Sequence, residues 1–329
     1  MCDLKCPWPL LILLLTLSSV LESNTWSKNP ILLPGEELLL LDAPAVSCKS
    51  GTLEADTELP LQFRRSDTLN ASGSAQFSVP QLKKVLAQSG GNSTRSPARS
   101  LERNPPLLID LRQEPHGYLN DAAVSWYGAD NAINATRPNQ EIERDEAARL
   151  RGLLLQQSVT LKSFVSSKNP ESCPVGEGMD LSLPPNSIAT EADLVTQLGA
   201  SYLRIPVPDH QRPKDRDVDL FLSQVKGLSP ETWIHFHCEA GKGRTTTFLV
   251  LYDILRNCTG VSLSAILERQ KRLGGSDLQD THSKTDPRRK KWAMERFEFI
   301  QQFYKYCLGE SPTFRSTWSN WSKSRKGNK

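Results

Sequence analysis

The sequence predicts an α/β fold, because short apolar runs typical of buried strands alternate along the chain with amphipathic helical patterns. Residues 106–112 and 232–236 are two such runs, and a loop follows each of them. The chain has 329 residues, which is long enough for one large or two smaller domains with a hydrophobic core.

The N-terminus has the pattern of a targeting segment. Lys5 precedes an almost purely apolar stretch at residues 7–21, which is shorter than the roughly 20 residues of a membrane helix. We therefore expect residues 1–23 to be a secretory signal peptide, with an uncleaved anchor as the alternative. The expectation implies a secreted or periplasmic protein without stable membrane association after cleavage. We expect an extended arm at residues 24–58 and the main domain at residues 59–329 to follow.

Helix caps and strand-like runs set the order of the remaining elements. Ser78 is a typical N-cap for a helix over residues 79–88, and Thr190 is one for a helix over residues 191–198. Expected strands lie at residues 106–112, 122–127, 159–165, 199–207 and 232–236. Further helices are expected at residues 141–157, 217–228, 246–255, 261–273 and 292–308.

Charge and cysteine content narrow the class of protein. The 40 basic and 37 acidic residues give a net charge of +3, so no overall field attracts nucleic acid, and we expect none as a partner. Two of the seven cysteines, Cys2 and Cys6, would leave with the signal peptide. The odd number that remains fits one free catalytic thiol with up to two disulfides, and the sequence assigns no pairing.

The most informative segment is residues 237–246, which reads His-Cys-Glu-Ala-Gly-Lys-Gly-Arg-Thr-Thr. An expected strand precedes it and an expected helix follows it, so the backbone N–H groups and the helix N-terminus converge on one point. Gly241 and Gly243 allow the close approach that such a loop needs. We expect residues 239–243 (Glu239, Ala240, Gly241, Lys242 and Gly243) to bind phosphate.

That arrangement indicates nucleophilic chemistry on phosphorus. The same N–H groups would stabilise a thiolate at Cys238, which can attack a bound phosphate and form a phosphocysteine. The guanidinium of Arg244 can hold two phosphoryl oxygens. Thr245 can donate its hydroxyl to the sulfur, and His237 is expected to order the loop from behind. A lone cysteine is usually a buried apolar residue, but here the cysteine, glycines and arginine occur in register.

Hydrolysis also needs a proton donor for the leaving alkoxide. Asp209 is the best candidate, since it lies in a proline-flanked loop after an expected buried strand, 29 residues before Cys238. The alternative is an aspartate that only caps a turn.

The motif His-Cys-x-x-Gly-x-x-Arg-Ser/Thr resembles the signature of the cysteine-dependent protein tyrosine phosphatases, and the fuller string resembles the protein-tyrosine-phosphatase-like phytases. The resemblance implies a tyrosine-phosphatase-like central sheet flanked by helices, with a small partial β-barrel inserted at about residues 117–185. It also implies myo-inositol hexakisphosphate and lower inositol phosphates as substrates, with no metal and no cofactor.

The resemblance carries further residues with it. The pair Asp209-His210 matches the family's acid and its neighbour, and Arg64 and Glu114 match residues near the phosphate pocket. Lys291, or its neighbour Lys290, falls where the family offers a C-terminal lysine to substrate.

The sequence also departs from the family pattern. Residues 166–185 lack the expected His-Lys pair, Asn131 stands where an aspartate is expected, and Lys242 replaces a small apolar residue, as in phosphoinositide 3-phosphatases.

Other functions remain open at this point. One is a protein tyrosine or dual-specificity phosphatase, including an exported effector, and another is a phosphoinositide phosphatase. A catalytically inactive phosphate-binding module fits less well, because Cys238, Arg244 and Asp209 occur together. A rhodanese-like sulfurtransferase also fits less well, because Arg244 and Thr245 suit phosphoryl transfer better. The sequence leaves the oligomeric state open.

Overall fold

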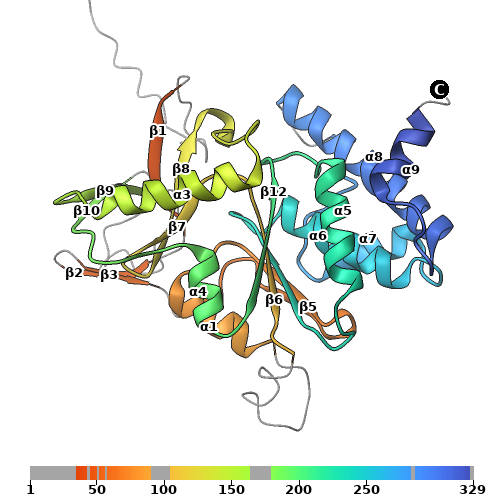
Figure 1. Ribbon diagram of the computed structural model, residues 1–329, viewed down its shortest axis with the longest axis horizontal. Coiled ribbons are helices and arrows are strands. Elements are labelled where there is room, and N and C mark those ends of the chain that lie inside the picture. Colours follow the sequence, from red (N-terminus) through yellow and green to blue (C-terminus); the bar gives the residue numbers. More distant parts are fainter. Residues whose placement is uncertain are drawn as a thin grey trace, which may run out of the picture. The chain divides into compact units, whose positions relative to one another are not determined.

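The signature loop belongs to a five-stranded sheet with the strand order β12-β6-β13-β5-β4. The computed structural model describes residues 35–42, 45–49, 52–55, 58–89, 104–163, 179–282 and 286–326. Four strands are parallel: β12 (Ser201–Val207), β6 (Leu107–Arg112), β13 (Ile234–His237) and β5 (Ala71–Ser74). The edge strand β4 (Arg64–Ser66) runs antiparallel to β5. The parallel strands lie side by side in Figure 1.

Helices cover both faces of this sheet, as expected for buried parallel strands. Successive side chains of β6 enter opposite cores: Leu107, Ile109 and Leu111 enter one and Leu108 enters the other. The larger core also takes residues from α5 (Asp215–Lys226), α6 (Gly243–Asn257), α7 (Leu263–Arg272), α8 (Pro287–Glu310) and α9 (Trp318–Lys326). The smaller core includes residues of α1 (Val79–Ala87) and α4 (Glu191–Gln197).

A second sheet has six strands in the order β10-β9-β1-β8-β7-β11. Its strands are β1 (Glu37–Leu41), β7 (His116–Leu119), β8 (Ala122–Gly128), β9 (Val159–Ser163), β10 (Met179–Leu183) and β11 (Ile188–Ala189). The helix α3 (Asn139–Leu153) packs Leu150 and Leu153 into the core of this sheet. Two short 3-10 helices, η1 (Asp67–Leu69) and η2 (Ala129–Asn131), and a hairpin of β2 (Ala45–Lys49) and β3 (Thr52–Ala55) complete the elements.

The second sheet corresponds largely to the β-rich insertion expected at residues 117–185. Two strands lie outside that range: β11 follows it directly, and β1 lies in the segment that the sequence predicted to be an extended arm. It pairs antiparallel with β8 and parallel with β9, so part of the arm is a central strand of the sheet.

The two predicted helix caps are confirmed. Ser78 accepts from Gln81 N and begins α1, and Thr190 accepts from Asp193 N and begins α4. Most other expected elements are present with ends that differ by a few residues, such as α8, which begins at Pro287 rather than residue 292.

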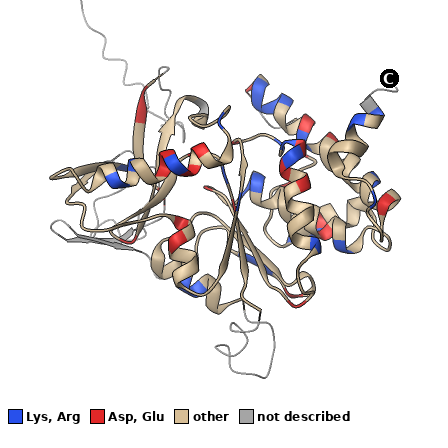
Figure 2. Ribbon diagram, in the orientation of Figure 1, with Lys and Arg blue, Asp and Glu red and all other residues tan. Residues whose placement is uncertain are grey.

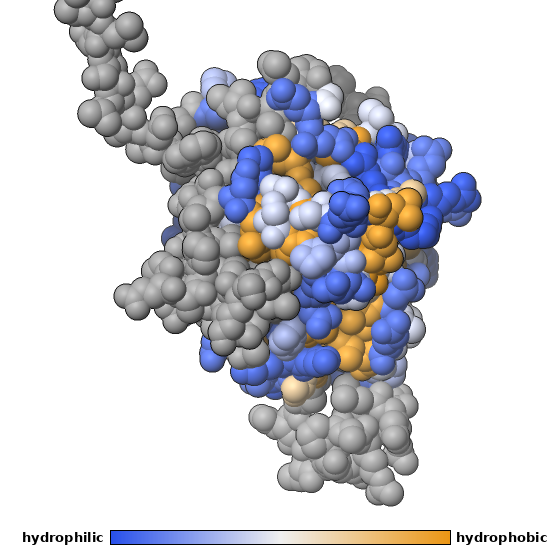
Figure 3. Space-filling model, turned by 90° about the vertical axis from the view of Figure 1, so that its left-hand side faces the viewer, coloured by the Kyte–Doolittle hydropathy of each residue, from blue (hydrophilic) through white to orange (hydrophobic). Residues whose placement is uncertain are grey.

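Within the described residues, no helix combines the length and apolar character needed to cross a bilayer. The expected signal peptide at residues 1–23 lies outside the described part of the chain. Figure 3 shows the side of the molecule that carries the six-stranded sheet, where apolar and polar surface alternate. At the end of α3, Leu154 and Leu155 are exposed.

Candidate active site

The candidate site lies at the carboxyl ends of the four parallel strands. Gln76 follows β5, Glu114 follows β6, Asp209 follows β12 and Cys238 follows β13. Parallel strands bring their carboxyl ends to one edge of a sheet, which is where open α/β sheets bind ligands. The topology therefore brings together groups that lie up to 162 positions apart in the sequence.

The signature loop connects β13 to α6 and depends on its two glycines. Gly241 has a φ of +66°, and a Cβ there would lie 2.3 Å from the backbone N of Ala75. A Cβ on Gly243 would lie 2.8 Å from Nη1 of Arg296. Within the described structure, the N–H groups of residues 239–243 donate to no protein acceptor, so they are available to a bound anion.

Cys238 lies at the base of this loop, with 2% of its surface exposed. The hydroxyl of Thr245 donates to Sγ of Cys238 over 3.1 Å, in the contact that the sequence predicted for these residue types. Cys258 and Cys307 are also free and buried.

The guanidinium of Arg244 is held by Glu114 and lies beside Asp209. Nη1 and Nη2 donate to the two carboxylate oxygens of Glu114 over 2.7 and 3.0 Å, and Nη2 lies 3.2 Å from Oδ1 of Asp209. Burial alone would raise the pKa of Glu114, but Arg244 and Arg112 hold it well below its ordinary value. Glu114 therefore remains ionised and fixes the orientation of the guanidinium.

The loop after β12 places Asp209 beside Arg244, and 18% of the Asp209 side chain is exposed. Its Oδ1 also accepts from the backbone N of His210 over 2.9 Å. The ring of His210 stacks on that of Trp292, with centroids 6.4 Å apart. Burial lowers the pKa of His210 below its ordinary value, which favours the neutral ring.

Glu239 carries a carboxyl within the loop itself. Burial, followed by repulsion from Asp209, raises the pKa of Glu239 to about 8. Its Oε2 accepts weakly from Nδ2 of Asn131 over 3.4 Å. The asparagine that departs from the family pattern thus offers an amide donor to this carboxyl.

Arg64 supports the loop from below. Its guanidinium donates to the carbonyl oxygen of Gly241 over 2.8 Å and to the hydroxyl of Thr246 over 3.0 Å. Burial lowers the pKa of Arg64 to about 10. Arg64 therefore contacts the loop and the start of α6, and its binding of substrate phosphate stays a prediction.

The basic start of α8 supplies a cation that the sequence analysis missed. Figure 2 shows Lys and Arg gathered on its first turns. Lys290 and Lys291 are exposed, and Nζ of Lys291 lies 3.9 Å from Glu295. Arg296 instead lies against Gly243, and its Nη1 lies 3.4 Å from the carbonyl oxygen of His210. The basic spacing along the helix could have pointed to Arg296, because it lies two turns after Arg289.

A buried polar cluster lies behind Cys238. Asp110, Glu191 and His237 bring potential ligating atoms within 4.8 Å of one another. Oδ2 of Asp110 accepts from Tyr202 over 2.8 Å, and Oε2 of Glu191 accepts from Gln76 over 2.8 Å. Tyr202 and Gln76 thus orient the two carboxylates of this cluster.

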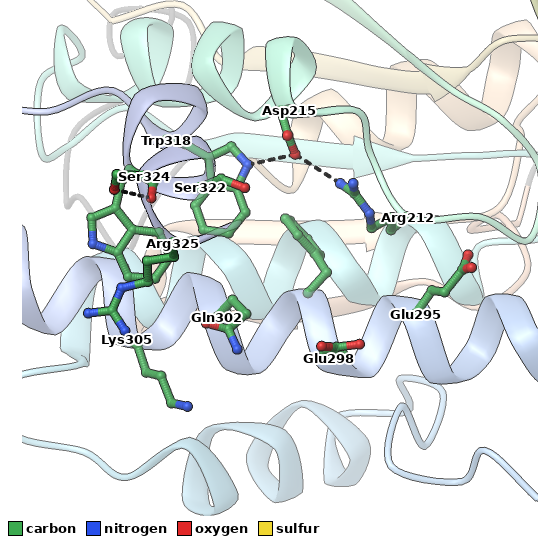
Figure 4. A pocket seen from close by; sticks show the side chains of 12 residues that line it. Arg212, Asp215, Glu295, Glu298, Gln302, Lys305, Trp318, Ser322, Ser324 and Arg325 are labelled. Atoms are coloured by element: carbon green, nitrogen blue, oxygen red, sulfur yellow. Dashed lines mark hydrogen bonds and ion pairs between the residues drawn. The ribbon is translucent and has the colours of Figure 1, made fainter. Parts of the chain in front are cut away.

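A groove of about 1000 Å³ lies between α8, α9 and the start of α5. Trp318 and Phe299 form its apolar floor, and Figure 4 shows Asp215 between Arg212 and Trp318. Cys238 and Arg244 do not line the groove, which is therefore separate from the candidate site.

Comparisons with known proteins agree with this geometry. The model of the PTP-like phytase family, whose description reads "Inositol hexakisphosphate", matches residues 109–256. A solved PTP-like phytase from Bdellovibrio bacteriovorus is 30% identical, with a TM-score of 0.65, and the match covers 90% of this chain and 97% of that one.

Two further relatives are longer proteins. A PTP-like myo-inositol phosphatase from Mitsuokella multacida, solved with myo-inositol-(1,3,4,5)-tetrakisphosphate, is 31% identical over 90% of this chain, with a TM-score of 0.75. Effector protein hopD2 of Pseudomonas syringae is 25% identical over 74% of this chain. The chain spans 49% of the length of each of these two proteins.

Proposed function

Because the chain belongs to the family of PTP-like phytases, we propose that it hydrolyses the phosphomonoesters of inositol polyphosphates through a phosphocysteine intermediate. The observation that carries the proposal is the juxtaposition of Cys238, Arg244 and Asp209 at one sheet edge. Each of the three has a distinct role in the reaction.

In the first step, the phosphate binds to the N–H groups of residues 239–243, and the thiolate of Cys238 attacks phosphorus. The S–P bond forms as the P–O bond to the inositol breaks. Asp209 gives its proton to the departing oxygen, and Arg244 stabilises the charge on the phosphoryl oxygens. Arg244 is already oriented by Glu114, so little reorganisation is needed.

In the second step, the carboxylate of Asp209 takes a proton from water, and the water oxygen attacks phosphorus. The S–P bond breaks, which releases inorganic phosphate and regenerates the Cys238 thiolate. The hydroxyl of Thr245, 3.1 Å from the sulfur, stabilises the thiolate as it leaves.

The cations around the loop support a substrate with several phosphates. Lys242 is exposed at the start of α6, and Arg296 lies against Gly243. Together with Arg244, these residues could neutralise phosphates next to the one attacked. The Mitsuokella structure with a bound inositol tetrakisphosphate supports this substrate class.

Phosphate release from myo-inositol hexakisphosphate and from a phosphotyrosyl peptide tests the proposal. We expect a higher kcat/KM on the inositol phosphate, and loss of release from both substrates in Cys238→Ser. Higher kcat/KM on the peptide would replace the proposal with a protein phosphatase, and an active Cys238→Ser would exclude the phosphocysteine.

We also propose that the protein is exported, on the basis of the apolar stretch at residues 7–21 that follows Lys5. The test is expression of the 329-residue chain in cells, followed by separation of the cytoplasmic and exported fractions. N-terminal sequencing of the protein then shows whether residues 1–23 have been removed. A cytoplasmic protein that retains residues 1–23 would contradict this.

A further inference from the structure

Glu191 is a fully buried acid that the reaction above does not use. It is the first residue of α4, yet its side chain does not cap that helix, because Thr190 accepts from Asp193 N in that role. Instead, Oε1 of Glu191 lies 2.6 Å from Nε2 of His237, the residue before the nucleophile. Burial alone would raise the pKa of Glu191, but the neighbouring His237 ring holds it below its ordinary value. The carboxyl is therefore ionised.

The other carboxylate oxygen of Glu191 connects to the opposite end of the loop. Oε2 accepts from Nε2 of Gln76 over 2.8 Å, and Oε1 of Gln76 accepts from Nη1 of Arg112 over 3.0 Å. Nε of Arg112 then donates to Glu114 over 2.8 Å. Since Glu114 holds Arg244, one chain of buried contacts runs from the residue before Cys238 to the arginine six positions after it.

Gln76 also holds the middle of the loop. Its backbone N donates to the carbonyl oxygen of Glu239 over 2.9 Å, while its side chain joins Glu191 to Arg112. All the side chains in the chain of contacts are at most 3% exposed. Buried polar groups of this kind tolerate few alternative arrangements, because an unpaired donor or acceptor is costly.

We propose that Glu191 and Gln76 are positioning residues that fix His237 and Arg244 relative to each other, and so hold both ends of the signature loop in its reactive conformation. The proposal rests on the proposed function, because it assigns these residues a part in that reaction. Neither residue touches the phosphate. Both act through His237 and Arg244.

Other titratable side chains surround Glu191, Gln76 and His237. Asp110 of β6 lies 3.8 Å from Nε2 of His237, and His116 of β7 lies 3.7 Å from Oε2 of Glu191. Tyr118 of β7 accepts from Gln76 over 3.3 Å, and His235 of β13 stacks on His237. A change at Glu191 therefore acts on a defined set of neighbours.

The test compares Glu191→Gln, Gln76→Ala and the double variant with the wild-type chain. Each single change should lower kcat by up to about a hundredfold with little change in KM, because a small displacement of a reacting group is enough for such a loss. Since both residues belong to one chain of contacts, the double variant should lose no more than the worse single variant. Multiplied losses would overturn the proposal.

A second readout does not depend on the natural substrate. The rate at which iodoacetamide alkylates Cys238, followed against pH by mass spectrometry, reports the thiolate. In Glu191→Gln the midpoint of this alkylation rate should move to higher pH, because the carboxylate that holds His237 at 2.6 Å is lost and the loop N–H groups then stabilise the thiolate less well. An unchanged midpoint with unchanged kcat would overturn the proposal. If the wild-type chain turns over no inositol phosphate, the proposed function fails, and alkylation together with turnover of p-nitrophenyl phosphate still tests the positioning.

Thr190→Ala is the matched control. It removes the cap of α4 next to Glu191 but leaves the chain of contacts intact. We expect it to lower the melting temperature without changing kcat or the alkylation midpoint. If Glu191→Gln does not fold, Gln76→Ala removes no charge and carries the same test. A loss of kcat in Thr190→Ala equal to that in the test variants would show that general destabilisation explains them.

Discussion

Glu239 has the least expected ionisation state of the residues in the signature loop. The loop is built to bind anions, yet this carboxyl is buried near Asp209, Asp42 and Glu114, whose repulsion Arg112 offsets in part. With its pKa raised to about 8, Glu239 is mostly protonated at neutral pH and adds little negative charge beside a bound phosphate. A carboxyl in the loop is therefore compatible with an anionic substrate.

The raised pKa of Glu239 should make the free energy of unfolding depend on pH. Between pH 4.5, the ordinary pKa of a glutamate, and about pH 8, Glu239 keeps its proton in the folded protein and loses it in the unfolded chain. Stability should therefore fall as pH rises through this window, by at most about 1.4 kcal/mol per pH unit from this group. Urea unfolding at pH 5, 6.5 and 8 should show a smaller fall in Glu239→Gln. Equal pH dependence in the two proteins would contradict the assignment.

The role of Asp209 predicts a dependence on the leaving group. Asp209→Asn should lower kcat on an inositol phosphate by roughly a hundredfold or more, because an alkoxide leaves poorly without a proton. The loss on p-nitrophenyl phosphate should be much smaller, since p-nitrophenolate needs little protonation. Steady-state kinetics on both substrates measure the difference. Equal losses on the two would mean that Asp209 acts on something other than the leaving group, such as the orientation of Arg244.

At the scale of elements, α8 shows why the register of a helix decides which cation reaches the site. Arg289 and Arg296 lie seven positions apart, which brings them to the same side of the helix. Both affect His210, since Arg289 and Arg296 contribute to lowering its pKa after burial itself. Lys291 lies on another side and faces Glu295. The helix therefore presents Arg296, rather than Lys291, to the signature loop.

This register predicts different effects for two substitutions on the same helix. Arg296→Ala should raise KM for inositol hexakisphosphate about tenfold or more, because a charge-assisted contact with a second phosphate is lost. Lys291→Ala, the matched control, should change KM by less than about twofold, as expected for an exposed charge. A larger effect at Lys291 would restore the sequence-based assignment of the C-terminal lysine.

At the scale of the whole molecule, the sequence predicts local features better than distant partners. The signature loop and the caps at Ser78 and Thr190 are readable because all their determinants lie within a few positions. The strand β5 was missed because its sequence, Ala-Ser-Gly-Ser, has no apolar alternation. Gly73 must nevertheless be small, since a Cβ there would lie 2.7 Å from Thr245.

The same reasoning explains which site residues the sequence could not place. Glu114 was expected near the phosphate pocket, but its pairing with Arg244 depends on the neighbouring strands β6 and β13. The contact of Glu191 with His237 likewise requires a helix that begins 46 positions earlier. Such contacts depend on strand order, which no local pattern encodes.

The N-terminal strand β1 belongs to the six-stranded sheet, and the residue after it contacts the end of β6 in the other sheet. It lies between β8 and β9, and Leu41 is 3% exposed in the core of the six-stranded sheet. The next residue, Asp42, accepts from Nη1 of Arg112 over 2.8 Å, and Arg112 contacts Glu114 at the active site. A segment that looked like an extended arm thus supports both the second sheet and the site.

Leu41→Ala tests the contribution of β1 to the whole fold. The loss of a buried leucine side chain should lower the free energy of unfolding by about 2–5 kcal/mol. Leu38→Ala, at a half-buried position of the same strand, should cost clearly less. Urea unfolding followed by tryptophan fluorescence and by circular dichroism should give one coincident, shifted transition in Leu41→Ala, because β1 pairs with strands far apart in the sequence. Turnover well below the melting temperature should be nearly unchanged, since Asp42 and Arg112 are retained. Unfolding of the six-stranded sheet in a separate earlier transition, with the signature loop still active, would instead show that the two sheets fold independently.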